Sequence, residues 1–218
     1  TANLLGFKTN LKFRGIKSIY LKFKEKSILP NKLHWLYFDS EKLLFNRVTE
    51  IKKMSKNTSP EDETILTAEI TFSKGDDVDK MNSKELEDIV KKQLLSIGLI
   101  KNKNFIESSC NTENFVYPVQ VKGYNEELSK VKYFINKFEQ LYSIGTGGEF
   151  SYADSQILFH KAFDIVDIFC GKESKTTQVI RQSNLEKMEK NININSRLIG
   201  DGYPTYIIAE IGLNHNNS

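Results

Sequence analysis

A glycine-rich segment in the last third of the chain has the residue types and spacing of an anion-binding turn. Gly145-Thr146-Gly147-Gly148 follows a predicted short apolar strand (141–145), passes Phe150 and Tyr152, and leads into a predicted helix near Asp154. Free N–H groups at a helix N-terminus attract anions, and glycine lets a ligand approach the main chain closely. The segment lacks a Walker lysine and the GxGxxG order, which excludes an ATP loop and the usual first dinucleotide loop. A phosphate or diphosphate site and a plain turn both remain open.

Arg47 is the strongest candidate for a substrate contact outside that segment. It lies at the end of a predicted strand over 44–48, where a guanidinium can clamp a phosphate or carboxylate. The alternative is a surface arginine. Tyr117, which precedes a proline, either lines the same cleft or packs in the interior. His34 and Trp35 are assigned to the sheet, and the three scattered histidines define neither a Ser–His–Asp nor a Cys–His set.

The elements that must position these residues are predicted from periodicity. Strand-like runs over 16–23, 33–38, 44–48 and 65–72 follow one another at hairpin-like spacing, which predicts an antiparallel sheet with one wet face. A helix is predicted from Asn82, with Glu85 completing a capping box, to a stop at Gly98. A second helix is predicted over 125–139, with a short strand over 115–119 between the two helices.

Composition narrows the class of protein. The net charge of +3, from 31 basic and 28 acidic residues, does not indicate a nucleic-acid partner. No stretch approaches the ~20 consecutive apolar residues of a membrane span, and the first residues lack the apolar core of a signal peptide. Cys110 and Cys170 can form neither a disulfide framework nor a four-ligand zinc site, so we predict no metal site and a reducing, cytoplasmic compartment.

The charge is unevenly distributed. Residues 1–60 carry 13 Lys/Arg and 4 Asp/Glu, whereas residues 61–100 carry 5 and 10. Three interpretations remain open: solvated lysines, two oppositely charged faces of one domain that meet, or a basic patch that receives an anionic ligand.

The last part of the chain changes character twice. Residues 171–196 are polar and lack aromatic side chains, which predicts a linker, with a short helix around 184–189. Residues 206–212 then have the continuous apolar character of a buried parallel strand. Because such a strand cannot complete a domain without further elements, we expect the C-terminus to be cut from a longer polypeptide.

This last stretch resembles the opening of the sialic acid synthase family. The run Ile208-Ala209-Glu210-Ile211-Gly212, followed by Asn214-His215-Asn216 and preceded by Ile199–Pro204, carries the likeness; Asn217 stands where the family usually has glycine. The resemblance implies the first strand of a TIM barrel, with Glu210 catalytic at the strand's C-terminal end and Asn214 and His215 binding substrate at the same rim. A divalent metal would belong only to a complete synthase domain.

Residues 1–170 are similar to the C-terminal half of FAD-dependent amine-oxidase-like proteins, the group that holds protoporphyrinogen oxidases and UDP-galactopyranose mutases. The likeness rests on Phe45–Lys52 (aromatic-x-Arg-Val-x-Glu), on Tyr117-Pro118-Val119, and on Gly145–Tyr152 with its helix. It implies FAD as cofactor, bound by Gly145, Thr146, Gly147, Gly148, Phe150, Tyr152 and Asp154, with Arg47 and Tyr117 contacting substrate. Thr146 replaces the family's usual arginine, which removes a bidentate phosphate partner.

These expectations combine into one prediction. The fold is α+β or α/β: an antiparallel substrate-domain sheet (1–170) whose helices return to an incomplete FAD-binding Rossmann-like domain, a linker (171–196), and the start of an incomplete TIM barrel (197–218). The resemblances imply a fragment, inactive by itself, of a fused FAD-dependent oxidoreductase-like or mutase-like protein and sialic acid synthase in nonulosonic acid or surface-polysaccharide biosynthesis. A sugar or nucleotide-sugar is the expected substrate, and homo-oligomerisation of the full-length protein stays open. The alternative is a flavin-free, partner-binding extension of a phosphoenolpyruvate-dependent synthase.

Overall fold

The computed structural model describes residues 5–30, 32–138, 141–171, 191–194, 196–200 and 203. The chain divides into two compact units: residues 14–114, here the sheet unit, and residues 1–13 with 115–218, here the helical unit. The boundary falls within strands β1 (Lys12–Phe23) and β5 (Phe105–Val119), which contribute residues to both units. The predicted domain over 1–170 therefore contains two units, and its predicted limits at 170 and 196 stay predictions.

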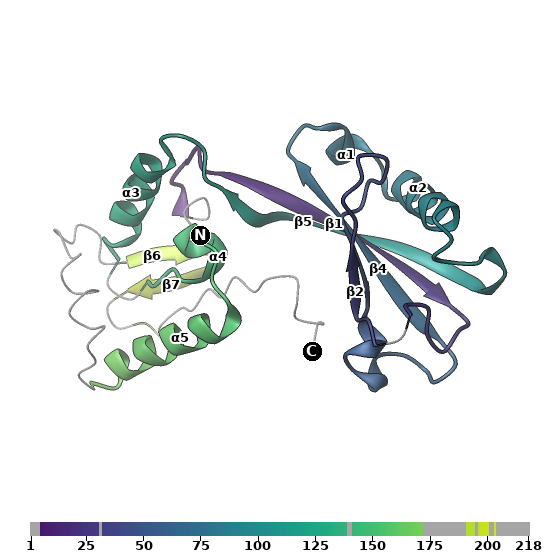
Figure 1. The fold of residues 1–218 in the computed structure, drawn as a ribbon. Helices are drawn as coiled ribbons and strands as arrows, with labels where there is room; N and C mark the ends of the chain where they lie inside the picture. Colours follow the sequence, from purple (N-terminus) through teal and green to yellow (C-terminus); the bar gives the residue numbers. More distant parts are fainter. Residues whose placement is uncertain are drawn as a thin grey trace. The chain divides into compact units, whose positions relative to one another are not determined.

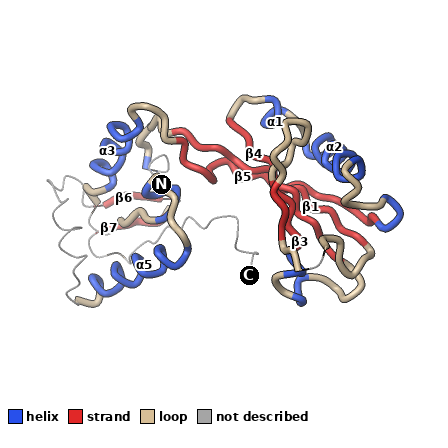
Figure 2. Tube along the Cα trace, viewed as in Figure 1, coloured by secondary structure: helices blue, strands red, loops and turns tan. Residues whose placement is uncertain are grey.

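The sheet unit is built on a five-stranded antiparallel sheet in the order β2-β3-β4-β1-β5 (Figures 1 and 2). Its other strands are β2 (Trp35–Tyr37), β3 (Arg47–Glu50) and β4 (Thr64–Ser73). The register of β1 on β4 runs from Arg14 opposite Ser73 to Phe23 opposite Thr64. The predicted antiparallel sheet is confirmed. The strand predicted over 44–48 was wrong in its limits, because Leu44 bonds its amide to the side chain of Gln93 and pairing begins only at Arg47.

Helices cover one face of this sheet. Short α1 (Asp77–Lys80) precedes α2 (Ser83–Ser96), whose N-cap Asn82 accepts a hydrogen bond of 2.9 Å from the Glu85 amide, as the capping box predicts. Buried Leu86, Val90 and Leu94 of α2 pack in one core with inward-facing residues of the strands, among them Ile19, Leu21, Val48, Leu66, Ala68 and Ile70. Three 3-10 helices complete the unit: η2 (Ile51–Lys53), η3 (Lys56–Thr58) and η4 (Asn102–Asn104).

Gly15 allows three strands to approach closely. It lies opposite Phe72 in the β1–β4 register, and a Cβ at this position would lie 2.4 Å from the Phe72 ring and 2.6 Å from the carbonyl oxygen of Glu113 on β5. Since real Cβ atoms do not approach that closely, only glycine fits here without displacing its neighbours.

The helical unit contains α3 (Tyr124–Ile135), α4 (Gly145–Glu149), α5 (Ser155–Phe169) and a hairpin of β6 (Asn191–Ile194) and β7 (Arg197–Gly200). Its buried cluster joins Val131, Ile135, Phe138 and Leu141 to the partly buried side chains of Leu5, Phe7 and Leu11. Among the described residues, none of the helices combines the length and the apolar character that crossing a bilayer requires.

One strand predicted for this unit is absent, and another is longer than predicted. Residues 141–144 have no regular secondary structure and lead into α4, which begins at Gly145. The strand predicted over 115–119 is only the end of the 15-residue β5, whose polar, mostly exposed first part carries no apolar alternation. The end of the predicted linker pairs as β6 with β7; the helix predicted around 184–189 lies outside the described residues.

Candidate functional site

The face of the sheet opposite α2 carries an ordered set of polar and aromatic side chains, here the polar face. In antiparallel strands, directly paired residues project to the same side. One row of pairs across β2, β3, β4 and β1 consists of Tyr37, Arg47, Glu69 and Ser18; the neighbouring row consists of Trp35, Thr49, Thr67 and Tyr20. The intervening row, with Leu36, Val48, Ala68 and Ile19, lies in the core on the other side.

Arg47 is held at the centre of the polar face. Its Nε and Nη2 atoms donate to the Glu69 carboxylate at 3.0 and 2.6 Å, and Nη1 donates to the Tyr37 hydroxyl at 3.3 Å. Burial lowers the pKa of Arg47, but the hydrogen bonds to Glu69 and Tyr37 outweigh it and set the pKa above its ordinary value. The arginine is therefore always charged and is oriented by its neighbours. As a substrate contact it stays a prediction, and an anionic ligand would have to compete with Glu69.

Sequence reasoning missed two exposed aromatic residues of the polar face. Trp35, which was assigned to the sheet alone, is 45% exposed, and Tyr37 beside it is 68% exposed. The hydroxyl oxygen of Thr67, in contrast, is buried without a hydrogen-bond partner among the described residues. Exposed aromatic rings beside fixed polar groups are suited to bind a sugar, through its apolar ring face and its hydroxyls. Positions 35 and 37 alternate along the strand, so the sequence indicates that both aromatic side chains lie on one face of the sheet. It does not show which residues of the neighbouring strand lie opposite them.

The glycine-rich segment folds as α4, with Gly145 buried at its first position at a φ of +93°. Gly148 packs so closely on Ser143 that a Cβ would lie 2.7 Å from its Oγ. Phe150 ends α4 at a φ of +56°; its ring is buried edge-on to Phe13 and tilted against Tyr124. The predicted cofactor contact Phe150 is thus a packing residue that fixes the end of α4.

The segment after α4 brings two other predicted residues together. Tyr152 is exposed and stacks on Tyr117, with ring centroids 5.5 Å apart and planes 7° apart. Asp154, near which the sequence predicts the helix start, is the N-cap of α5, but its carboxylate accepts from the side chain of Gln156 (3.3 Å) rather than from a helix amide. The main-chain amides of this helix start therefore lack a side-chain cap.

The residues present fit a phosphate-bearing cofactor through the main chain. Thr146, Gly147 and Gly148 put little side-chain bulk between a ligand and the amides of α4, and neither α4 nor α5 begins with a side-chain cap. Lys161 is the single Lys or Arg between positions 141 and 171, and it donates to Glu149 at 2.7 Å. Phosphate charge would consequently be met by amide dipoles and not by a guanidinium.

The remaining predicted site residues, Glu210, Asn214 and His215, lie outside the described residues. Within the described ranges, no three His, Cys, Asp or Glu side chains gather in a way that could hold a metal ion.

Comparisons with known proteins place this fold. No protein-family model and no curated protein matches the chain. A solved structure of reduced UDP-galactopyranose mutase aligns with a TM-score of 0.64 and 21% identity over 80% of this chain and 37% of the mutase. A protein described as a protoporphyrinogen oxidase from Exiguobacterium sp. 255-15 aligns with a TM-score of 0.48 and 15% identity over 60% of this chain and 30% of its own. The chain thus has the fold of part of a UDP-galactopyranose mutase and spans little more than a third of that protein's length.

Proposed function

We propose that this chain is part of a flavoenzyme-like protein that acts on a sugar or nucleotide-sugar, in nonulosonic acid or surface-polysaccharide biosynthesis. The observation that carries the proposal is the fold, which follows that of UDP-galactopyranose mutase over 80% of the chain. The arrangement of the polar face supports it independently, because a fixed Arg47–Glu69 pair bordered by Trp35 and Tyr37 offers the groups that recognise a sugar.

FAD is the cofactor that this fold implies, and it would supply the redox or nucleophilic chemistry of its flavin ring. The amides of Thr146, Gly147 and Gly148 would hold its phosphates, and the buried Phe150 keeps these amides in place. The stacked Tyr117 and Tyr152 would border the bound cofactor. On the polar face, Glu69 accepts hydrogen bonds from sugar hydroxyls or orients Arg47 to donate them.

The proposal requires further polypeptide. Since the chain spans 37% of the mutase, residues that hold the rest of FAD would come from sequence outside these 218 residues. At the other end, the IAEIG-x-NHN run supports a fused synthase in which Glu210, Asn214 and His215 act and to which any divalent metal would belong.

The main test is flavin retention by the full-length protein. After gentle purification we expect flavin absorbance bands at near one flavin per chain. Thr146→Arg should slow flavin loss on dialysis, because it restores a cation beside the phosphates. Ser129→Arg on α3 is the charge-matched control and should leave the rate unchanged. Colourless protein, with no flavin taken up by either the wild type or Thr146→Arg, would reject the flavin proposal.

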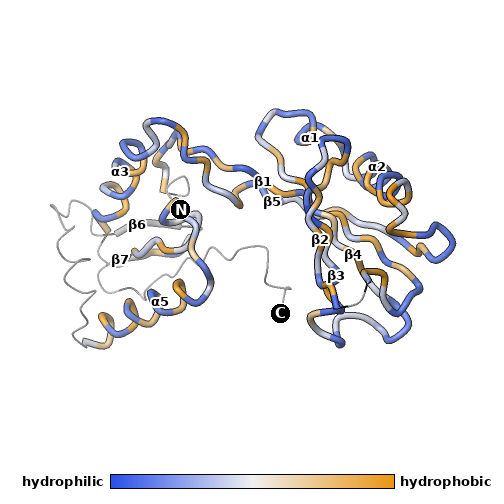
Figure 3. Tube along the Cα trace, in the orientation of Figure 1, coloured by the Kyte–Doolittle hydropathy of each residue, from blue (hydrophilic) through white to orange (hydrophobic). Residues whose placement is uncertain are grey.

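The alternative is a flavin-free extension of a phosphoenolpyruvate-dependent synthase that binds a partner. One observation favours it: α5 buries none of its residues and exposes Ile157, Phe159, Phe163, Val166 and Phe169, so that apolar positions recur along the whole helix (Figure 3). Phosphoenolpyruvate consumption with N-acetylmannosamine-type sugars tests the synthase part. Turnover by colourless full-length protein would support this alternative, and an inert protein would count against it.

A further inference from the structure

The two rows of the polar face hold one cation and one anion, Arg47 and Glu69. The other members of these rows are uncharged: Ser18, Tyr20, Trp35, Tyr37, Thr49 and Thr67. The pair is well shielded from water, since the side chain of Arg47 is 25% exposed and that of Glu69 is 15% exposed. Charges shielded in this way interact more strongly than fully solvated charges do. The charge balance of the polar face is therefore set by these two residues.

The guanidinium of Arg47 is largely occupied by the protein itself. Nε donates to Oε2 of Glu69 at 3.0 Å, and Nη2 donates to both carboxylate oxygens at 2.7 and 2.6 Å. Nη1 donates to the Tyr37 hydroxyl at 3.3 Å, and the guanidinium carbon lies 5.8 Å from the centre of the Tyr37 ring. A carboxylate or phosphate binds arginine best through two parallel N–H groups. In the described part of the chain one N–H group, on Nη1, is left over, which suits a single neutral acceptor such as a hydroxyl oxygen.

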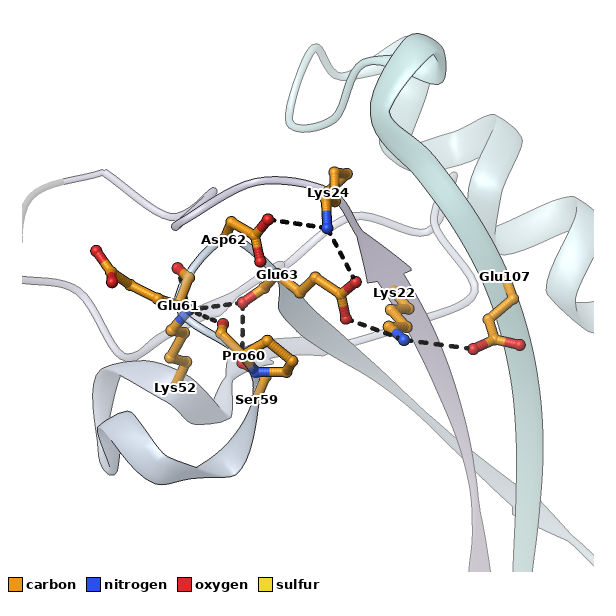
Figure 4. Close-up of polar contacts among 9 residues, drawn as sticks. All are labelled: Lys22, Lys24, Lys52, Ser59, Pro60, Glu61, Asp62, Glu63 and Glu107. Atoms are coloured by element: carbon orange, nitrogen blue, oxygen red, sulfur yellow. Dashed lines mark hydrogen bonds and ion pairs between the residues drawn. The ribbon is translucent and has the colours of Figure 1, made fainter.

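The neighbouring cations of β1 do not add a positive charge to these rows. Lys22, which projects to the same side of the strand, pairs with Glu63 at 3.0 Å and with Glu107 at 3.8 Å (Figure 4). Arg14 lies about 13 Å along the strand from Ser18, which exceeds the screening length of about 8 Å at physiological ionic strength. The Lys22–Glu63 pair also shows that the basic start and the acidic middle of the chain meet within one unit, which is one of the three interpretations left open by the sequence.

The carboxylate of Glu69 favours a ligand that donates hydrogen bonds. An ionised carboxylate is an acceptor only, and its two oxygens can accept more bonds than the three that Arg47 donates. Sugar hydroxyls supply such donors. An ionised carboxylate or phosphate on a sugar does not, and the negative charge of Glu69 repels it.

We propose that Glu69 is a specificity-determining residue of the polar face: by neutralising Arg47, it selects an uncharged sugar ring and disfavours a ring that carries a carboxylate or a phosphate. The inference rests on the proposed function, because it takes the polar face to be a sugar site. The exposed rings of Trp35 and Tyr37 contact the apolar face of the sugar, and Glu69 accepts hydrogen bonds from its hydroxyls.

Ligand-observed NMR titrations of the whole chain with galactose and galacturonate, which differ by one carboxylate, test the proposal. The wild type should bind galactose at least as tightly as galacturonate. Removing one unit charge about 4 Å from an anion in water changes the affinity about fivefold. Glu69→Gln should therefore shift the preference toward galacturonate by about fivefold or more, because Arg47 is left without a counter-charge. Arg47→Gln should shift the preference about as far in the opposite direction.

A double variant and a distant variant separate the effect of charge from that of packing. Arg47→Gln/Glu69→Gln again carries no net charge at the pair, so its preference should return to that of the wild type. Glu85→Gln removes the same charge from an exposed position on α2, which covers the opposite face of the sheet, and should leave the preference unchanged. A purely structural Glu69 would give a different result, since Glu69→Gln would then weaken the binding of both sugars alike and the double variant would stay impaired.

The outcomes distinguish a failure of this inference from a failure of the proposed function. A wild type that prefers galacturonate, or a Glu69→Gln protein with the wild-type preference, would overturn the role of Glu69 and leave the sugar site intact. Binding of neither sugar by the wild type or by any variant would reject the polar face as a sugar site, and the role of Glu69 with it. Flavin retention is measured separately, so its result does not affect this test.

Discussion

Removal of the buried Glu50 carboxylate should destabilise the sheet unit more than any other single change of an ionisable residue. The side chain is fully buried and joins the end of β3 to the loop after β1 and to the start of β4. Glu50→Ala leaves the Leu29 amide and the Thr64 hydroxyl without acceptors. Each unsatisfied buried group costs about 1–3 kcal/mol, so we expect a loss of about 3–5 kcal/mol in the free energy of unfolding.

Glu50→Gln gives a graded version of the same test. If the amide nitrogen takes the position of Oε1, the Thr64 hydroxyl can turn to accept from it, while Oε2 still accepts from Leu29. The Leu29 and Ile28 amides then keep Oε2 as their acceptor, at 2.8 and 3.2 Å, whereas the hydrogen of the Thr64 hydroxyl loses its acceptor and the charge assistance is lost. Hydrogen bonds to charged groups stabilise a fold by about 1 kcal/mol more than neutral hydrogen bonds do. The desolvation cost of the charge also disappears, so we expect a loss of about 1–2 kcal/mol in the free energy of unfolding.

Urea unfolding followed by Trp35 fluorescence provides the assay, because Trp35 is the only tryptophan and lies in the sheet unit. The exposed Glu61 supplies matched controls, and its Ala and Gln variants should stay within about 0.5 kcal/mol of the wild type. A Glu50→Ala protein as stable as these controls, or a Gln variant less stable than the Ala variant, would refute the reasoning.

Three other predictions follow from single contacts. Gly15→Ala should destabilise the sheet unit by about 1–3 kcal/mol in the same assay, and Phe72→Leu in that background should recover only part of this, because the Glu113 carbonyl still obstructs the Cβ. Phe150→Ala should cost about 3–5 kcal/mol, measured by faster hydrogen exchange of the α3 and α4 amides; unchanged exchange would contradict its role as an anchor. Hydrogen bonding from Lys22 holds the pKa of Glu63 below its ordinary value, so this pair stabilises the fold above that ordinary pKa and the stabilisation is lost as the pH falls through the lowered value. Glu63→Gln should accordingly flatten the decline of the urea midpoint between about pH 5 and pH 3, and an unchanged decline would exclude the pair as its source.

The candidate site shows where sequence patterns are informative. The alternation within β4 placed Leu66, Ala68 and Ile70 on the core face, and Asn82 with Glu85 located the start of α2. Both signals are local, since strand alternation and helix capping involve neighbours a few residues apart. The same locality explains the failure at β5, because a polar edge strand is specified by its pairing partner and not by its own pattern.

Arg47 shows what local sequence patterns do not reveal, which is the partner of a side chain. The sequence identified it as a guanidinium at a strand end, but whether it faces a ligand or a carboxylate depends on Glu69, which lies 22 residues further along the chain. Trp35 and Tyr37 became part of the polar face for the same reason. Their partners are set by the register of three strands, which no short window contains.

By itself, the sequence determined the antiparallel sheet, its capped covering helix, the glycine segment before a helix, and the likeness to a flavoenzyme fold. Periodicity, capping and turn residues act over a few positions and are therefore legible in order along the chain. The tertiary structure alone decided that Arg47 is held by Glu69, that Phe150 is an anchor, and that Glu50 is buried. These facts arise from contacts between distant segments, whose energies depend on burial and on geometry that exists only after the chain has folded.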